Sequence, residues 1–126
     1  MKAEFRIYEN IHTPLLYKYM KPDDRIIRAA KSAVKMILDL EFEQYDTTSR
    51  QRHLTFAREC FSSLVRNNTN FSLRYIGALY KKKYDHSTII AQCGNIENLE
   101  FMGRRDDRFS DWEQIKENFN LMTQFN

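Results

Sequence analysis

Only three glycines and two prolines interrupt this chain of 126 residues. Folds rich in β-sheet need these residues in their many turns, so their scarcity favours helices. The length suits one domain that can bury a core without disulfides or metals. The chain is 42% apolar and 29% charged, which is ordinary for a globular protein. We therefore expect one compact, all-α domain.

Apolar side chains recur at three- and four-residue steps, which is the period of an amphipathic helix. The pattern predicts helices over 25–42 (with a start at 21–24), from Thr47 or Thr48 to about Arg66, and over 72–80, 85–99 and 112–125. Polar loops are expected over 41–49 and 103–107. Residues 1–24 carry too many large apolar groups for a disordered tail. We expect them to form an arm or short helix that packs on a body made of residues 25–126.

The stretch Phe71–Leu99 combines a short helix, a polar turn and a longer helix. Ser72 and Asp85 are suited to be N-caps, because their side-chain oxygens can accept from the free amides of a first turn. Lys81–Tyr84 has no apolar period and separates the two helices. The longer helix carries its apolar face on Ile89, Ile90, Cys93, Ile96 and Leu99. Two helices joined this closely, with cations in the turn, have the outline of a helix-turn-helix DNA reader.

Positive charge is concentrated in the middle of the chain. Thr47–Gly94 holds eight Lys or Arg against two acids, a net of +6, whereas the whole chain has +3 and the remainder therefore −3. A positive face favours an anionic partner such as nucleic acid. No run approaches the ~18 apolar residues of a membrane helix, and the N-terminus has no apolar signal core. We expect a cytoplasmic protein with no membrane partner.

Catalytic and metal chemistry find little support in the sequence. Asp85, His86 and Ser87 are adjacent on a helix and point in different directions, so they cannot form a nucleophile–base relay. The histidines are scattered, and Cys60 and Cys93 fit apolar helix faces without forming a CxxC pair. We expect reduced core thiols, no metal, no cofactor and no enzymatic activity.

Five short motifs follow one another between Ser49 and Leu99. They are Arg50-Gln51-Arg52, Ala57-Arg58-Glu59, Thr69-Asn70-Phe71-Ser72-Leu73, Ile76-Gly77 and Asp85-His86-Ser87-Thr88-Ile89. Together they resemble the C-terminal DNA-binding domain of the bacterial replication initiator DnaA family. That family has a basic loop, an Ala-Arg-Gln-type helix, a Ser-Leu-x-x-Ile-Gly helix and an Asp-His-Ser/Thr-Thr-Val signature. The resemblance implies a Trp-repressor-like helix-turn-helix with its core at 49–99, and it has a weaker echo at 115–119.

The resemblance implies a DNA site, and groove geometry supports it. The first residues of a recognition helix reach base edges, and a narrow minor groove attracts an arginine. Base contacts are expected from Asp85, His86, Ser87, Thr88 and Arg58 in the major groove and from Arg50 in the minor groove. Phosphate contacts, which set affinity and register, are expected from Lys81, Lys82, Lys83, Arg52 and Arg74. The plainer alternatives are a polar N-cap cluster and solvated surface charges.

Two features depart from the family pattern. Lys81–Tyr84 stands where the family commonly has a glycine-bearing turn, and it is one residue longer. Glu59 stands where the family often has Gln, and a carboxylate there repels phosphate and cannot donate to a base. Both changes bear on the target sequence more than on DNA binding itself.

The chain has no G-x-x-x-x-G-K-[ST] motif and no room for an ATPase domain beside the reader. We expect sequence-specific binding of double-stranded DNA in replication-origin or transcriptional regulation, in a nucleoid-associated bacterial protein. The alternatives are a helical protein-interaction module without specific DNA recognition and a nonspecific DNA-binding protein. A protein partner or a second copy could bind the N-terminal arm or the C-terminal helix.

Overall fold

The computed structural model describes residues 20–124, so the expected N-terminal arm falls outside it except for residues 20–24. Over the described range the chain is all-α, as predicted. Its elements are α2 (Pro22–Leu38), α3 (Phe42–Tyr45), α4 (Arg52–Asn68), α5 (Leu73–Ala78), α6 (His86–Met102), a 3-10 turn η1 (Gly103–Arg105) and α7 (Phe109–Thr123). No helix within residues 20–124 has the length and apolar character needed to cross a membrane.

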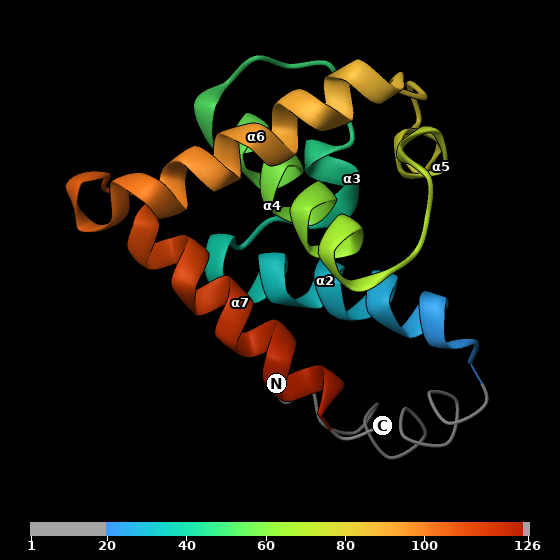
Figure 1. Cartoon of the computed structure of the whole chain (residues 1–126), viewed down its shortest axis with the longest axis horizontal. Coiled ribbons are helices and arrows are strands. Elements are labelled where there is room, and N and C mark those ends of the chain that lie inside the picture. Colours follow the sequence, from blue (N-terminus) through green and yellow to red (C-terminus); the bar gives the residue numbers. More distant parts are fainter. Residues whose placement is uncertain (1–19, 125–126) are drawn as a thin grey trace.

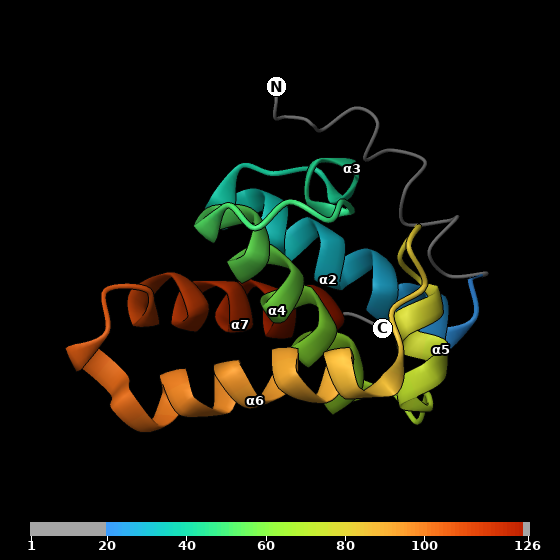
Figure 2. The same ribbon diagram turned by 90° about the horizontal axis from the view of Figure 1, so that it is seen from above.

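Helix α4 lies at the centre of the molecule. It packs against α2 on one side and α6 on the other, and also touches α3, α5 and α7. Helices α6 and α7 diverge from their junction at η1, with α4 and α2 in the opening between them in Figure 1, whereas in the view of Figure 2 α7 lies between α6 and α2. The short helix α5 packs against the opposite end of α6. The core therefore fixes the start of α6 from two directions, through α4 and α5.

The core is one continuous apolar cluster. Trp112, Ile115 and Phe119 of α7 are buried in it, as are the apolar faces of α4 and α6. Phe42 adds an aromatic group, with its ring centroid 5.0 Å from Phe61 and 5.6 Å from Tyr80. Cys60 and Cys93 are buried free thiols, in agreement with the sequence interpretation.

The region after α2 differs from the prediction. The helix expected to reach Phe42 ends at Leu38, because Asp39 adopts a left-handed conformation (φ 57°) and its N–H donates to Lys35 O at 2.8 Å. The prediction of a polar loop over 41–49 is wrong for its first half, because Phe42–Tyr45 forms α3. A capping box begins this helix, with Gln44 Oε1 accepting from Glu41 N at 2.7 Å. Tyr45 is fully buried, so tertiary packing decides the local structure here.

Other boundaries also shift. Helix α4 begins at Arg52 after Gln51, so neither Thr47 nor Thr48 is its N-cap. Helix α7 begins at Phe109, and η1 replaces the first part of the loop expected after α6. Ile90, which was expected on the apolar face of α6, is 47% exposed. The caps predicted at Ser72 and Asp85 are confirmed: Ser72 Oγ accepts from Tyr75 N at 3.1 Å, and Asp85 Oδ1 accepts from Thr88 N at 3.0 Å.

Candidate nucleic-acid interface

The first turn of α6 presents polar side chains at the surface. Asp85, His86 and Ser87 are exposed, and Thr88 is half-buried. Asp85 Oδ1 accepts from Thr88 N and also from Ser87 Oγ at 2.8 Å. The backbone hydrogen bond from Thr88, followed by that from Ser87, lowers the pKa of Asp85, so it is a carboxylate at neutral pH. The helix start is thus an ordered anionic and hydroxyl surface with a histidine beside it.

The turn before α6 is held by close backbone contact with α5. Tyr84 N donates to Gly77 O at 3.1 Å. A Cβ atom at position 77 would lie only 1.9 Å from Tyr84 O, so only glycine fits there. Lys83 adopts a left-handed conformation (φ 61°), which glycine accepts more readily than lysine. The side chains of Lys81, Lys82 and Lys83 are exposed on this turn.

Arg58 does not lie with the other predicted base-contacting residues, because its side chain points into the protein. It is only 6% exposed. Its Nη1 donates to the carbonyls of Tyr45 and Thr47, each at 3.0 Å. Its Nη2 donates to Ser49 O and, at 3.2 Å, to Thr55 Oγ1. The guanidinium therefore gathers three alternate carbonyls of the chain that leads into α4.

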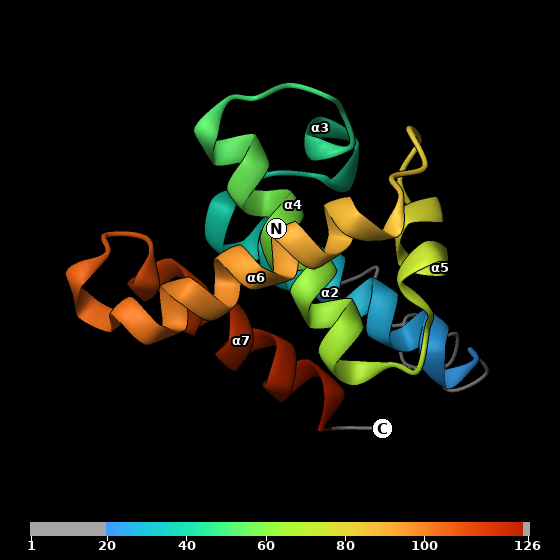
Figure 3. The ribbon, with the colours of Figure 1, turned by 45° about the horizontal axis from the view of Figure 1, so that its top comes forward.

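We call residues 46–51 the Arg50 loop, after the one cation that it carries. Two hydrogen bonds join it to the turn before α6: Tyr84 OH donates to Thr47 O at 2.9 Å, and Lys81 N donates to Asp46 Oδ1 at 2.8 Å. Loop and turn lie along the same edge of the molecule, at the top in Figures 1 and 3. Arg50 is exposed. The structure thus brings the Arg50 loop to the edge that carries Lys81–Lys83 and the start of α6.

Buried polar contacts fix α6 on α4. Ser62 Oγ lies 2.7 Å from Tyr80 OH and donates to Gln92 Oε1, and Tyr80 OH donates to Arg58 O at 3.0 Å. These groups are all buried, where an unpartnered polar atom would be costly. The network therefore links the turn after α5, the middle of α4 and the first half of α6.

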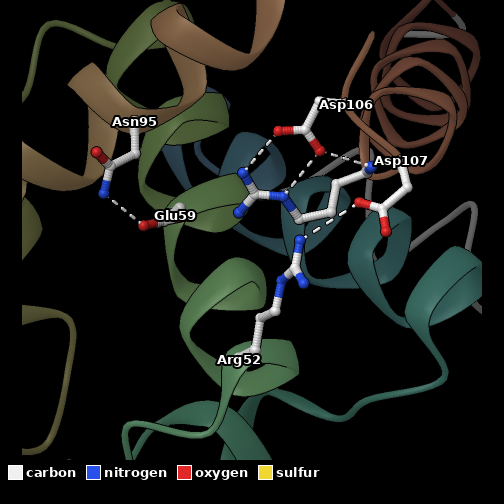
Figure 4. Close-up of polar contacts among 6 residues, drawn as sticks. Arg52, Glu59, Asn95, Asp106 and Asp107 are labelled. Atoms are coloured by element: carbon white, nitrogen blue, oxygen red, sulfur yellow. Dashed lines mark hydrogen bonds and ion pairs between the residues drawn. The ribbon is translucent and has the colours of Figure 1, made fainter. Parts of the chain in front are cut away.

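The two remaining predicted phosphate contacts are exposed but lie apart from this network. Arg74 is on the surface of α5. Arg52 begins α4, and its Nη2 lies 3.3 Å from Asp107 Oδ1 in an exposed ion pair (Figure 4). An exposed pair of this kind contributes little to stability and is easily exchanged for another anion.

Glu59 lies inside the protein, between α4 and α6. It is 5% exposed, and its Oε2 accepts from Asn95 Nδ2 at 2.7 Å (Figure 4). Burial raises the pKa of Glu59, against the opposing effects of the Asn95 hydrogen bond and the charges of Arg108 and Arg58. Arg108 is itself paired with Asp106, which holds the pKa of that carboxyl well below its usual range. The Glu59 carboxylate thus packs against α6 instead of lying on the outer surface.

Sequence reasoning missed the two residues that join the loop to the turn. The sequence pattern places Asp46 only in a polar loop and Tyr84 only at the end of a cationic turn. The available signal was Tyr84 itself, because a large aromatic residue is out of place in a solvated turn of lysines. Its ring packs on Tyr80, with centroids 5.2 Å apart, and its hydroxyl reaches the Arg50 loop.

These features define an all-α protein that holds a polar helix start, a cationic turn and an arginine-bearing loop along one edge. Comparison with known proteins then relates the chain to one family. It is 31% identical over 94 residues to the chromosomal replication initiator protein DnaA of Nostoc punctiforme, covering 72% of this chain and 19% of the relative. It is 38% identical over 74 residues to the DnaA protein of Oleidesulfovibrio alaskensis, covering 59% and 15%.

The DnaA protein of Nostoc sp. is 28% identical over 86 residues, which is 68% of this chain. The chain is therefore DnaA-related over about two thirds of its length, and it spans less than a fifth of these relatives. No family model matches the chain. No solved structure matches it significantly either.

Proposed function

We propose that this chain is a non-enzymatic, sequence-specific reader of double-stranded DNA, acting through a helix-turn-helix formed by α5 and α6. In this proposal it works at a replication origin or a promoter in the bacterial cytoplasm, as part of the nucleoid. The observation that carries the proposal is the exposed polar start of α6, with the Lys81–Lys83 turn and the Arg50 loop beside it. Its relation to DnaA replication initiators supports the same reading.

In the proposed complex, the start of α6 enters the major groove. Asp85 can accept from a cytosine amine, and Ser87 or Thr88 can pair with several bases. His86 offers a ring nitrogen to a base edge or packs flat on it. The exposed turn of Lys81–Lys83, together with Arg52 and Arg74, neutralises phosphates, which raises affinity without reading sequence. Arg50 enters the adjacent minor groove.

Arg58 receives a different role in this proposal from the one that the family resemblance implies. All four of its hydrogen bonds go to backbone carbonyls and a threonine within the protein. A base contact would require this buried guanidinium to give up partners that would then lack a donor. We therefore assign base reading to Arg50 and the start of α6 alone.

The proposal is tested by fluorescence anisotropy with two labelled duplexes, one carrying the family's origin box and one scrambled, at several salt concentrations. Specific recognition predicts tighter binding to the origin box at every salt concentration. Equal affinities with steep salt slopes would instead identify a nonspecific DNA-binding protein. No binding to either duplex at low salt would reject both DNA functions and favour a protein-interaction module.

A protein partner or a second copy, bound through the N-terminal arm or α7, is compatible with DNA binding and remains a prediction. Sedimentation of the free protein, alone and with duplex, measures the number of copies directly. A two-copy complex would predict a DNA site with two half-sites.

A further inference from the structure

The Arg50 loop lacks regular secondary structure, yet its backbone is held at several points. Arg58 donates to the carbonyl of Tyr45, the last residue of α3, and to the carbonyls of Thr47 and Ser49 within the loop. Inside the loop, Gln51 N donates to Ser49 Oγ at 3.2 Å. The loop therefore presents the carbonyls of Thr47 and Ser49 to the buried Arg58, while Arg50 remains exposed.

The same loop is joined to the element that starts α6. Thr47 O accepts from Tyr84 OH as well as from Arg58. The side chain of Asp46, the residue before Thr47, accepts from the backbone amide of Lys81. Tyr84 directly precedes Asp85, so a displacement of the turn moves both Thr47 and the N-cap of α6. These contacts connect two segments that are more than 30 residues apart in the sequence.

We infer that Arg58, Tyr84 and Asp46 are positioning residues that hold the Arg50 loop in fixed register with the start of α6. They make the minor-groove arginine and the major-groove helix one rigid unit, so that both reach their grooves only on a duplex of matching geometry. This inference rests on the proposed function and adds the origin of its specificity. An untethered loop would have to be ordered on binding, which lowers affinity without changing any contact to DNA.

The test is a double-mutant cycle between Tyr84→Phe and Arg50→Ala, measured by anisotropy on the preferred duplex. Tyr84→Phe removes one hydroxyl and keeps the ring that packs on Tyr80. We expect it to weaken binding about 3- to 10-fold, the effect of one lost hydrogen bond. In the Arg50→Ala background the same change should have an effect below about 2-fold, because no arginine remains to be positioned. Equal losses in both backgrounds would overturn the inference.

Tyr45→Phe is the matched control. It removes a buried hydroxyl from the residue that directly precedes the loop, and this hydroxyl has no hydrogen-bond partner within residues 20–124. Its affinity for DNA should equal that of the wild type. Arg58→Lys keeps the charge but replaces the forked donors by a single nitrogen. Its loss of affinity should likewise shrink in the Arg50→Ala background, whereas a direct base contact by Arg58 predicts a loss that persists there.

A measurement on the free protein separates this inference from the proposed function. Tyr84→Phe should raise the amide hydrogen-exchange rates of Ser49 and Gln51 while leaving those of α4 unchanged. If the wild type binds no duplex, the DNA function fails, and faster exchange in the variant would still establish the tether. Unchanged exchange in Tyr84→Phe would reject the tether whatever the DNA result.

Discussion

Gly77→Ala tests whether the turn before α6 has the close backbone contact seen in the structure. The new Cβ atom would lie 1.9 Å from Tyr84 O, and real Cβ atoms essentially never approach another heavy atom closer than 3.0 Å. The two segments must therefore separate by at least 1.1 Å, the difference between these distances. The obstacle is backbone, so no side-chain rotation relieves it.

The expected cost follows from what this separation disturbs. Overpacking costs ~1–3 kcal/mol, and the Tyr84 N to Gly77 O hydrogen bond, now 3.1 Å, contributes about 0.5–1.5 kcal/mol more. Alanine in a helix returns about 1 kcal/mol through its higher propensity. We therefore expect Gly77→Ala to lower the free energy of unfolding by ~0.5–3.5 kcal/mol.

Gly94→Ala is the matched control, because an added Cβ at this α6 position meets nothing within 4 Å. Its gain in helix propensity should stabilise the protein by ~0.5–1 kcal/mol. The two variants are compared by urea unfolding with the midpoint and slope fitted separately. If Gly77→Ala is as stable as the wild type, or if both variants gain stability, the close contact between α5 and the turn is refuted.

Three further predictions concern single side chains. Tyr45→Phe should raise the free energy of unfolding by ~1 kcal/mol, because it removes a buried hydroxyl that lacks a partner within residues 20–124; lower stability in urea would show that this hydroxyl has a favourable contact. The folded state raises the pKa of Glu59 above 4.5, so its stabilising contribution is present below that pH and is lost as the pH rises through the folded pKa. Glu59→Gln should therefore show a smaller fall in stability between pH 4.5 and neutral pH than the exposed control Glu97→Gln, and identical pH profiles would contradict this. In anisotropy, Lys82→Ala should weaken binding to all duplexes alike, whereas His86→Ala should cost ~1–3 kcal/mol on the preferred duplex alone; the reverse pattern would exchange their roles.

The parts of the fold that follow from local periodicity were predictable. Helices α4, α6 and α7 carry apolar residues at helical spacing, and the residues expected on the apolar face of α6 are buried except for Ile90. The caps at Ser72 and Asp85 depend on a side chain and an amide three residues later, so they too can be deduced locally. Helix α3 was missed because its four residues carry no period and are fixed by tertiary burial of Tyr45.

The candidate site was only partly predictable for a related reason. Exposure of Asp85, His86 and Ser87 follows from their place at a helix start. The burial of Arg58 does not follow from its sequence neighbours, because its acceptors are the carbonyls of a loop that folds back over α4. A charged residue can be buried once its donors find partners, and those partners belong to the tertiary structure. Ile90 shows the same limit for an apolar residue, because its helical spacing predicts burial and yet it is 47% exposed.

The shape of the Lys81–Tyr84 turn likewise depends on contacts with other parts of the fold. It places three like charges side by side and puts Lys83 in a left-handed conformation, so its own residues oppose the shape it takes. What holds it is neutral or backbone contact: Tyr84 N on Gly77 O, Tyr84 OH on Thr47 O and Lys81 N on Asp46. The lysine ammonium groups are thereby left out of the contacts that define the turn. In the proposed complex with DNA, the lysine charges can therefore exchange their counterions for phosphates without disturbing the fold that presents them.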